Sequence, residues 1–473
     1  MTREFRTFGN PYLPSWEYVP DGEPHVFGDR VYVYGSHDSF NGHVFCLGDY
    51  VCWSAPVEDL TLWRYEGVIY KKTNDPLNSS GSMCLYAPDV TQGPDGQFYL
   101  YYVLDKVSIV SVAVADNPAG PFSFYGYVRH PDGELLGERA GDENQFDPGV
   151  LTEGSITYLY TGFCSKGDRS RTGPMVSIIG PDMRTLVSGP KNLLPSEPYS
   201  KGSGFEGHEY FEAASMRKIK DTYYFIYSSV LLHELCYATS DRPDSGFKYR
   251  GVLISNNDLH IGGYKDPETP AYYGGNNHGS IAEIAGRWYV FYHRHTHGTT
   301  FCRQGCAEPI ELKKDGTFVQ AEMTSQGLRN KPFSGKGTYP AYIACNLWNE
   351  IPSLYTAQAA WPDNRFPLIT QEGKDGDEVD GFIGNMMDGA IAGFKYFDFS
   401  NVQSISIKVR GYCRGSFIVS TSPSGIAAAR IPVEFTNVWT EYRTTLNLED
   451  GIHALYFRYE GEGRASFASF SIE

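Results

Sequence analysis

The amino-acid sequence predicts an all-β protein, a five-bladed β-propeller followed by an antiparallel β-sandwich. Short runs of alternating β-branched and aromatic residues recur along the 473-residue chain, whereas apolar residues at helical spacing are scarce. A tyrosine-centred pattern is repeated five times in the first part of the chain. The remainder lacks this repeat and consists of alternating segments bounded by Gly and Pro, which is typical of a sandwich.

The repeat begins with a turn residue, followed by alternating β-branched or aromatic residues centred on a tyrosine. The copies align on Tyr32, Tyr99, Tyr158, Tyr224 and Tyr289, at spacings of 67, 59, 66 and 65 residues. Each unit is long enough for four short strands with their turns. Five such units predict a propeller, in which radial repetition covers the sheet edges, and an array of plain sandwiches is the alternative.

Each repeat also carries a polar residue 10 to 12 positions before its tyrosine. These residues are Asp21, Asp89, Asp147, Glu212 and His278. If the strand at this position is the innermost of its blade, the five side chains converge at one end of the central channel. Four carboxylates and one imidazole around an axis repel one another unless a proton, cation or substrate compensates. This cost to folding favours a functional role over a chance match.

A polar stretch rich in Gly and Lys, starting at residue 324, predicts a linker. We therefore divide the chain into a propeller domain, residues 1–325, and a sandwich domain, residues 326–473. In the sandwich, Tyr412 and Trp439 are candidates for a sugar-binding platform, but aromatic residues of this kind are more often in a core. Glu372 alone gives little support for an ion site.

Composition and charge exclude several classes of protein. The net charge of −16 disfavours nucleic acid and anionic membranes as partners and leaves a neutral or cationic small molecule. No apolar run is long enough for a transmembrane helix, and the N-terminal residues contain no signal-peptide pattern. The nine cysteines are scattered, and only Cys302 and Cys306 lie close together. We therefore expect a cytoplasmic protein with reduced thiols.

Two carboxylates that face each other across a channel can hydrolyse a glycosidic bond, if one stays ionised and the other protonated. Asp21 and Glu212, on the first and fourth of five blades, lie roughly opposite each other. Asp147, on the third blade, is next to Glu212, where like-charge repulsion raises the pKa of an acid. In an inverting hydrolase the two carboxylates are about 6.5–9.5 Å apart, which leaves room for water.

Residues 8–325 resemble glycoside hydrolase family 43, five-bladed propellers that include inverting α-L-arabinofuranosidases, β-xylosidases, arabinanases and xylanases. The matching segments are Asn10-Pro-Tyr-Leu-Pro, Asp21-Gly-Glu-Pro, Asp59-Leu-Thr-Leu-Trp, Phe146-Asp-Pro and Phe211-Glu-Ala-Ala. The resemblance implies that Asp21 is the general base, Asp147 the modulator of the acid's pKa and Glu212 the general acid. Because Gly22 replaces the family's proline and a second acid follows, the base is either Asp21 or Glu23.

The resemblance further implies an ion and several sugar contacts, although the chemistry itself needs no cofactor. His278 matches a histidine on the channel axis that binds calcium or sodium through water in many members. Arg303 matches an arginine that contacts the sugar at the cleaved bond. The other candidates for binding sugar are Glu23, Asp89, Phe27, Tyr86, Trp16 and Trp53. The alternative for each of these aromatic residues is a place in the core, and the alternative for Asp89 is a capping or turn role. Residues 383–399 resemble carbohydrate-binding module family 6, which often follows family 43 catalytic domains.

The run from His293 to His297 follows an expected strand, and His293 and His295 share a strand face on which a metal can be chelated. No carboxylate or cysteine stands at a suitable spacing. We therefore interpret these residues as ordinary loop histidines.

Together these features predict an inverting, exo-acting glycoside hydrolase. It releases pentose, α-L-arabinofuranose and also β-D-xylose, from arabinose- and xylose-containing oligosaccharides derived from hemicellulose. The absence of a secretion signal favours short imported oligosaccharides and hence exo action. The alternatives are a non-catalytic carbohydrate-binding propeller and an endo-acting arabinanase or xylanase. A propeller phosphorylase would need a cationic phosphate site, for which Arg303 is the one obvious candidate. The sequence leaves the oligomeric state open.

Overall fold

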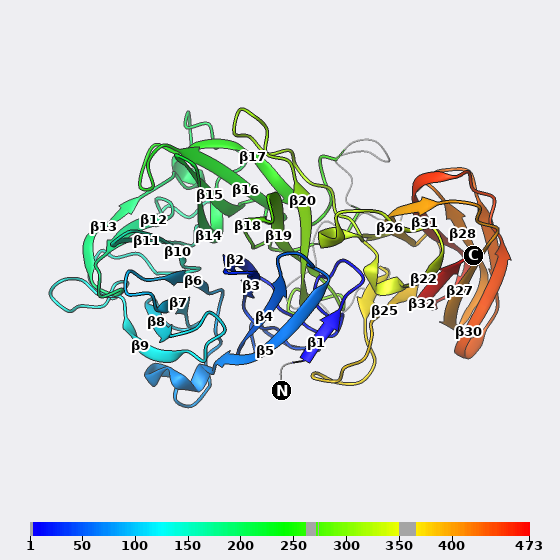
Figure 1. Ribbon diagram of the computed structural model, residues 1–473, viewed down its shortest axis with the longest axis horizontal. Coiled ribbons are helices and arrows are strands. Elements are labelled where there is room, and N and C mark those ends of the chain that lie inside the picture. Colours follow the sequence, from blue (N-terminus) through cyan, green and yellow to red (C-terminus); the bar gives the residue numbers. More distant parts are fainter. Residues whose placement is uncertain (1–2, 262–270, 273, 350–365) are drawn as a thin grey trace.

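The computed structural model describes residues 3–261, 271–272, 274–349 and 366–473. Figure 1 shows a ring of five β-sheets with a two-sheet sandwich beside it. The predicted fold class, an all-β propeller followed by an antiparallel sandwich, is confirmed. None of the helices in these ranges is long and apolar enough to cross a membrane.

The five sheets of the ring follow one another along the chain, and all neighbouring strands within them are antiparallel. The first sheet has β1 (Arg3–Arg6), β2 (Glu23–Phe27), β3 (Arg30–Tyr34), β4 (Tyr50–Pro56) and β5 (Leu62–Tyr70). The second has β6 (Asp89–Gln92), β7 (Phe98–Val103), β8 (Val110–Ala115) and β9 (Ser123–Tyr127). The third has β10 (Gly149–Glu153), β11 (Ile156–Thr161), β12 (Met175–Ile179) and β13 (Leu186–Asn192). The fourth has β14 (Tyr210–Ile219), β15 (Thr222–Ser229), β16 (Glu234–Ser240) and β17 (Lys248–Ser255), and the fifth has β18 (Ile281–Ile284), β19 (Arg287–His295) and β20 (Arg303–Ile310).

The sequence repeat corresponds to the second strand of each main hairpin, because the five reference tyrosines lie on β3, β7, β11, β15 and β19. The preceding strands contact one another around the ring: β6 contacts β2 and β10, β10 contacts β14, and β18 contacts β2. Arg217 of β14 donates to the carbonyl of Ile281 on β18, so these five are the inner strands. An isolated parallel bridge between Gly22 and Gly279 joins the first and last blades. The predicted strand is thus the innermost of its blade. Asp89 and Glu212 lie on it, whereas Asp21, Asp147 and His278 lie two or three residues before it.

Four strands per blade, however, is wrong for two of the five sheets. The first blade gains β1 at its outer edge, where it pairs with β5. The fifth blade has three strands in the part of the chain that the structure describes, and residues near the N-terminus run along the free side of β20. The backbone N–H of Tyr12 donates to the carbonyl of Gly305, and the Asn10 side chain bonds both backbone groups of Ala307. This segment closes the ring, because an uncovered β20 would leave its backbone groups unpaired.

The sandwich consists of two six-stranded sheets. One contains β21 (Phe333–Ser334), β23 (Asn346–Trp348), β26 (Ile391–Phe399), β28 (Cys413–Ser420), β29 (Ala429–Val433) and β31 (Gly451–Gly463). The other contains β22 (Gly337–Pro340), β24 (Leu368–Thr370), β25 (Phe382–Met386), β27 (Ser404–Gly411), β30 (Thr436–Thr445) and β32 (Ala465–Ile472). Among the described residues, the short 3-10 helices are η1 (Lys72–Asn74), η2 (Pro76–Asn78), η3 (Glu197–Tyr199), η4 (Gly327–Arg329) and η5 (Ala341–Ile343). The division at residue 325 falls between β20 and β21 and stays a prediction.

Phenylalanine rings fill the space between the two sheets of the sandwich. Phe394 on β26 packs edge-to-face on Phe470 of β32, with ring centroids 4.8 Å apart, and Phe457 of β31 lies 5.0 Å from Phe470. Tyr412, in contrast, is 80% exposed and packs on Phe435, so it is not a core residue. Whether this surface binds sugar stays a prediction.

The other residues singled out in the sandwich are bound to a neighbouring arginine. Trp439 is partly buried beneath the guanidinium of Arg410, which lies 4.3 Å from its ring. Glu372 accepts a hydrogen bond from the same guanidinium. The charge of the Glu372 carboxylate is therefore balanced by Arg410, so this carboxylate needs no bound ion.

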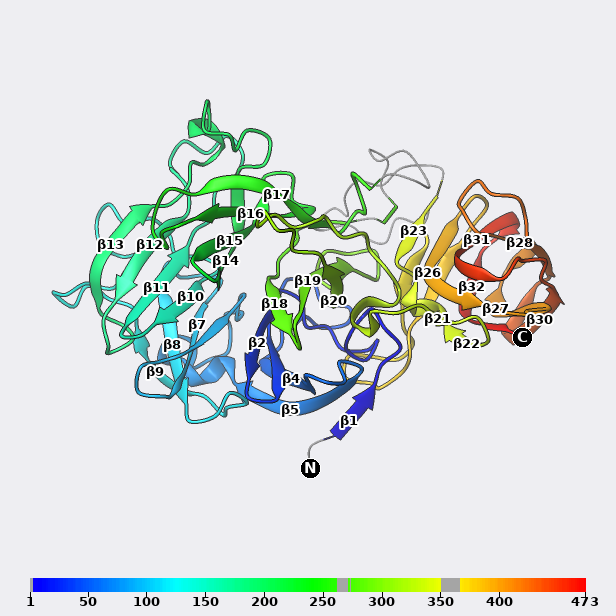
Figure 2. The same ribbon diagram turned by 45° about the horizontal axis from the view of Figure 1, so that its top comes forward.

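The propeller and the sandwich lie side by side in Figure 2. They share one hydrophobic cluster and a buried ion pair. The ammonium nitrogen of Lys395 on β26 lies 3.1 Å from a carboxylate oxygen of Asp258 and 3.1 Å from one of Glu322. Arg294 on β19 donates to the carbonyls of Tyr342 and Ala344. Burying these charges without partners would be costly, so both groups fix how the two parts dock.

A segment of the sandwich also reaches the first blade. The hydroxyl of Tyr18 donates to Gln371, at 2.6 Å, and the backbone N–H of Phe40 donates to Asp375, also at 2.6 Å. Phe40 belongs to the loop of residues 38–46, which is hereafter called the β3–β4 loop. This loop is thus supported from the sandwich side.

All nine cysteines of the chain are buried and none forms a disulfide. They are distributed over four blades, the connections between strands and the sandwich.

Candidate active site

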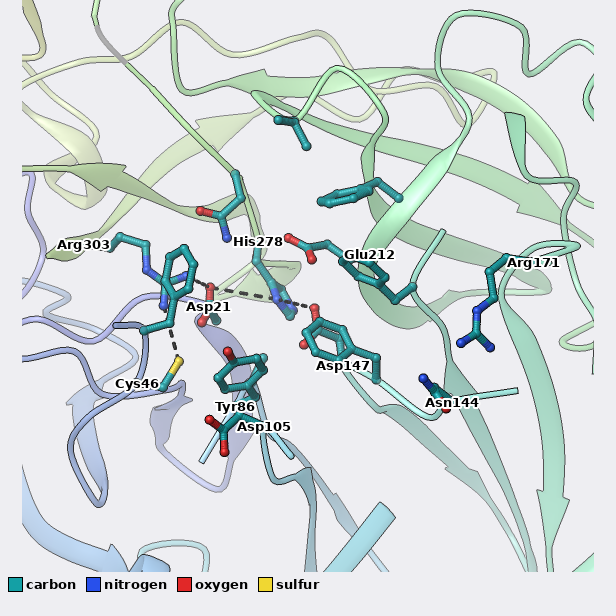
Figure 3. Close-up of a pocket in the computed structure, with 17 residues that line it drawn as sticks. Asp21, Cys46, Tyr86, Asp105, Asn144, Asp147, Arg171, Glu212, His278 and Arg303 are labelled. Carbon is teal, nitrogen blue, oxygen red and sulfur yellow. Dashed lines mark hydrogen bonds and ion pairs between the residues drawn. The ribbon is translucent and has the colours of Figure 1, made fainter. Parts of the chain in front are cut away.

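A pocket of about 440 Å³ opens at the end of the ring where the inner strands begin. Four of the five polar residues from the repeat line it, and Figure 3 shows their side chains around its floor. The lining residues from the sequence prediction are Asp21, Asp147, Glu212, His278, Arg303 and Tyr86. Pockets of roughly 300–1,000 Å³ are the usual size for small-molecule sites.

Asp21 enters the pocket from two positions before β2 and is almost fully buried. Its backbone is in the left-handed region, with φ +58°, which Asp tolerates better than most residues. Gly22 follows because a Cβ there would lie 2.9 Å from the hydroxyl oxygen of Tyr12, within the wall of the first blade. The glycine that departs from the family pattern thus results from close packing, and Asp21 still faces the pocket.

The carboxylate of Asp21 is held by cationic and polar neighbours. Arg303 donates to Oδ1 at 2.8 Å, Ser36 donates to Oδ2, and Nδ1 of His293 lies 3.2 Å from Oδ1. Burial acts to raise the pKa of Asp21, but Arg303 and His293 outweigh it, so the pKa lies far below its ordinary value. Asp21 is therefore ionised at every working pH.

Arg303 on β20 is fixed by a second carboxylate from the β3–β4 loop. Its Nε and Nη2 donate to the two oxygens of Asp38, at 2.8 and 3.0 Å, which is a bidentate pair. Its guanidinium carbon lies 4.8 Å from the centre of the Phe45 ring. Arg303 lines the pocket as predicted, and its guanidinium also orients Asp21. Asp38 gave no signal in the sequence, because it lies outside the repeat register.

Asp147 and Asp21 meet the same ring nitrogen of His278. Its Nδ1 lies 3.4 Å from Oδ2 of Asp147 and 3.9 Å from Oδ1 of Asp21, and Figure 3 shows the imidazole between them. Burial acts to lower the pKa of His278, but Asp147 and Asp21 outweigh it and raise the pKa to about 9. Asp147 also accepts the backbone N–H of Ala213, which ties it to β14.

Glu212 on β14 lies across the pocket from Arg303 (Figure 3). Ala213, directly after it, has φ +68°, and the register of β14 against β15 shifts on both sides of Glu212. Such an irregularity re-aims a side chain at the end of a strand. Burial, then the charge of Asp147, raise the pKa of Glu212 to about 8. Glu212 is therefore largely protonated at neutral pH.

Three predicted sugar contacts do not line the pocket. Glu23, the first residue of β2, is two positions after Asp21 and binds Ser215 and Arg217, at 3.0 and 2.6 Å. Asp89 accepts hydrogen bonds from the backbone N–H groups of Val90 and Val150 and shares one with His25. Its two oxygens therefore face these groups and not the pocket.

The third, Phe27, packs on Phe98 at 4.9 Å in the core between the first two blades. Trp16 and Trp53 pack in the core of the first blade, as the alternative interpretation had it. The sequence pattern predicts the strand on which a candidate sugar contact lies, but not how far that residue is from the pocket.

The interpretation of His293 and His295 as loop residues is wrong. Both are buried on β19, and His293 contacts Asp21, which is 272 positions away in the sequence. Its other nitrogen, Nε2, lies 2.8 Å from the carbonyl of Asn276. Ring closure brings the first and last blades together, and no local spacing could predict this contact.

One wall of the pocket is a row of aromatic rings. Tyr86, Phe146, Phe163 and Phe211 line it, with successive ring centroids 5.5, 5.2 and 5.0 Å apart. Tyr86 was predicted, whereas the three phenylalanines were missed. Two of them, Phe146 and Phe211, directly precede Asp147 and Glu212 in the sequence. Their position beside two predicted catalytic residues could have identified them as pocket residues. The remaining lining residues are Phe45, Cys46, Ala87, Asp105, Asn144, Arg171, Leu232 and Asn276.

Below the pocket, the inner strands hold a group of donors that fits a hard cation. Glu23, His25 and Asp89 offer ligand atoms within 4.8 Å of one another. Among the described residues, Oε1 of Glu23 is buried without a hydrogen-bond partner. Calcium takes oxygen ligands and keeps bound water where protein ligands are few, so the carboxylates of Glu23 and Asp89 are the donors of this group that suit it. Arg217 already supplies one positive charge to Glu23.

Comparisons with known proteins agree with this architecture. The sequence model of glycosyl hydrolases family 43 matches residues 15–318. The chain is 66% identical to a xylosidase/arabinosidase of Thermoclostridium stercorarium over 98% of both chains. It is 29% identical to xylosidase/arabinosidase 43A of Humicola insolens, over 64% of this chain and 96% of that protein.

Solved structures give the same result. A β-xylosidase/α-arabinofuranosidase from a compost microbial metagenome, in complex with xylotriose and calcium-free, matches with a TM-score of 0.53 and 26% identity. That match covers 67% of this chain and 98% of the other. An arabinoxylan arabinofuranohydrolase from Bacillus subtilis has the same fold over 98% of this chain and 97% of its own, with a TM-score of 0.53 and 20% identity. With the family model spanning most of the propeller and a close relative extending over nearly the whole length, the chain belongs to glycoside hydrolase family 43 and is a glycosidase.

Proposed function

We propose that this glycosidase is an inverting, exo-acting enzyme that releases α-L-arabinofuranose, and also β-D-xylose, from hemicellulose-derived oligosaccharides. The observation that carries the proposal is that two carboxyl groups in one pocket have pKa values shifted in opposite directions. The pKa of Asp21 lies far below its usual range, whereas that of Glu212 is raised to about 8. Two carboxyl groups whose pKa values are pushed apart supply one base and one acid at neutral pH.

In the proposed reaction, the ionised Asp21 accepts a proton from a water molecule that attacks the anomeric carbon. Glu212 gives its proton to the departing glycosidic oxygen, and the two groups act on opposite faces of the sugar. Asp147 keeps Glu212 protonated, because its charge opposes ionisation of the acid. Arg303 and His293 hold the Asp21 carboxylate in place. The leaving group then lies on the side of Arg171 and Asn144, beyond Glu212 (Figure 3).

The row of aromatic rings and the small volume support a substrate that enters by its end. Flat apolar rings pack on sugar faces. Relatives named xylosidase/arabinosidase support pentose as the released sugar. We further propose a cytoplasmic location, which the nine unpaired thiols support, because disulfides are rare in reducing compartments.

We also propose that the axis below the pocket can take a calcium or sodium ion, with the carboxylates of Glu23 and Asp89 as candidate ligands and His278 as the predicted contact through water. When bound, such an ion supplies positive charge beneath the carboxylates of the pocket. The calcium-free state of one structural relative supports an ion that is dispensable for folding.

A panel of nitrophenyl glycosides, with the α-L-arabinofuranoside and the β-D-xyloside side by side, tests the released sugar. Proton NMR of the first-formed product tests the stereochemistry, and we expect inversion. Unsubstituted arabino- and xylo-oligosaccharides test the mode of action. Monosaccharide as the sole early product supports exo action, and a mixture of shorter oligosaccharides supports the endo-acting alternative. Retention of configuration would overturn the mechanism.

A further inference from the structure

A second cluster of metal-ligating side chains lies at the top of the fourth blade, outside the pocket. His208 precedes β14, Glu234 and Cys236 lie on β16, and His260 follows β17. The ligand atoms of His208, Glu234 and Cys236 lie within 4.8 Å of one another. The Nε2 atom of His260 lies 3.9 Å from Oε1 of Glu234. Three separate segments of the blade therefore bring one carboxylate, one thiol and two imidazoles together.

Only one of the two carboxylate oxygens of Glu234 has hydrogen-bond partners among the described residues. Its side chain has no exposed surface, and its Oε2 is contacted by Nδ1 of His208 at 2.8 Å and by the hydroxyl of Ser229 at 2.9 Å. Its Oε1 is buried without a hydrogen-bond partner in the described part of the chain. A buried carboxylate oxygen without a donor is costly, and a cation is one of the few groups that remove the cost.

The spacing of the donors is close to that of a tetrahedral site. Zinc–nitrogen and zinc–sulfur bonds of about 2.0 and 2.3 Å place neighbouring ligand atoms about 3.3–3.6 Å apart. The Sγ of Cys236 lies 3.6 Å from Oε2 of Glu234. The Nε2 of His260 is at 3.9 Å from the other oxygen, and only the contact of His208 is shorter. Small side-chain rotations therefore suffice to surround an ion.

We propose that His208, Glu234, Cys236 and His260 form a site for a zinc-type divalent metal ion. The mixture of nitrogen, oxygen and sulfur donors suits zinc or cobalt and not calcium or magnesium, which take oxygen. The side chains of His208 and His260 are 32% and 37% exposed, which leaves a path from solvent to the buried carboxylate. On binding, the thiol of Cys236 gives up its proton to water and its sulfur bonds to the metal.

The site would act as a clamp near the pocket and not as part of the chemistry. His208 is four residues before Glu212, and Glu234 is two residues after Leu232, which lines the pocket. A bound ion joins these segments to the end of β17. It thus fixes the start of the strand that carries the acid.

Cobalt(II) is the probe for this site, because a thiolate ligand gives a charge-transfer band in the near ultraviolet. The full chain is treated with a chelator, dialysed and titrated with cobalt, followed by zinc. We expect one cobalt per chain with the thiolate band, displacement by zinc, and a higher Tm with the metal. His208→Gln should lose the band and the Tm shift. Cys236→Ala should lose the band.

His453→Gln, in the sandwich, is the matched control and should behave like the unchanged chain. His208 is partly exposed, so its variant keeps the test valid if Cys236→Ala fails to fold. A titration without a thiolate band, or a band that survives in His208→Gln, overturns the proposal. Metal bound only on the propeller axis gives no thiolate band and therefore counts against it as well.

Discussion

Asp21 and Glu212 face the same pocket, but they differ in what surrounds their oxygens. The carboxylate of Asp21 is bound by Arg303, Ser36 and His293, whereas no cationic side chain among the described residues forms an ion pair with Glu212. A carboxyl group that is buried beside another carboxylate keeps its proton. The division of labour between base and acid therefore follows from packing partners and not from residue type.

Glu212→Gln should remove most activity on natural oligosaccharides, by roughly 10²–10⁴-fold, because the amide cannot protonate the leaving oxygen. The loss should be smaller on nitrophenyl glycosides, whose leaving group needs little protonation. Steady-state kcat/KM on both substrate classes measures the difference. Equal losses on both would assign the acid to another residue.

Asp21→Asn and Glu23→Gln should have different effects, because only Asp21 lines the pocket. Asp21→Asn should lower kcat by about 10³-fold or more on every substrate, and azide should restore part of the rate by replacing the activated water. Glu23→Gln weakens its pair with Arg217 and should lower Tm while leaving activity within a few-fold. Azide rescue of Glu23→Gln, with Asp21→Asn still active, would reverse the assignment.

Asp147→Asn should move the alkaline limb of the pH profile. Burial and then Asp147 raise the pKa of Glu212 to about 8, so kcat/KM should fall above that pH as the acid loses its proton. Without the charge of Asp147, the pKa of Glu212 falls and the limb moves to lower pH. Asp105→Asn, in the same pocket, is the control and should leave the limb in place. An unmoved limb in Asp147→Asn would remove Asp147 from its role.

At the residue scale, the sequence predicted which side chains start the inner strands but not what each one touches. Four of the five repeat residues reach the pocket, whereas Asp89 is turned to the backbone of Val90 and Val150. The period fixes the position of a residue around the ring. Hydrogen-bond partners such as His293 come from another blade, and no spacing in the chain encodes them.

At the scale of the elements, the β3–β4 loop links the pocket to the sandwich. Asp38 at its start binds Arg303, Phe45 near its end lies under the same guanidinium, and the N–H of Phe40 donates to Asp375. The loop is therefore held from both sides. Its geometry sets one wall of the pocket.

Asp375→Ala should raise KM by up to about tenfold with little change in kcat, since losing one hydrogen bond of about 1 kcal/mol loosens the loop and not the reacting groups. Glu378→Gln, in the same segment, breaks only an exposed pair with Arg3 and should change neither constant. Initial rates against substrate concentration distinguish the two. A normal KM in Asp375→Ala would show that the propeller holds the loop unaided.

The strands themselves were the most predictable elements, because a two-residue period survives in every blade. The number of strands per blade was not predictable, since the first blade takes β1 and the fifth leaves an edge to residues near Asn10. Edge pairing depends on which chain segment is free at ring closure. That is a property of the assembled ring and not of any repeat.

At the scale of the whole molecule, the buried contact of Lys395 with Asp258 and Glu322 makes the two parts depend on each other. Lys395→Met should lower the free energy of unfolding by about 3–5 kcal/mol, because it removes the cation from a buried carboxylate. Denaturant unfolding measures the loss. Lys408→Met, on an exposed position of β27, is the control and should stay within about 0.5 kcal/mol. A small loss in Lys395→Met would mean that apolar contacts alone dock the sandwich.

The nine buried cysteines are natural reporters of local unfolding. Cys46 lines the pocket, but the other eight do not, so a thiol reagent modifies each of those only when its own surroundings open. Cys52, Cys164 and Cys236 report on three blades, Cys345 on the junction and Cys413 on the sandwich. Timed alkylation followed by peptide mass analysis would therefore read the order in which the parts come apart. No label has to be introduced for that purpose, and every reporter is already part of the chain.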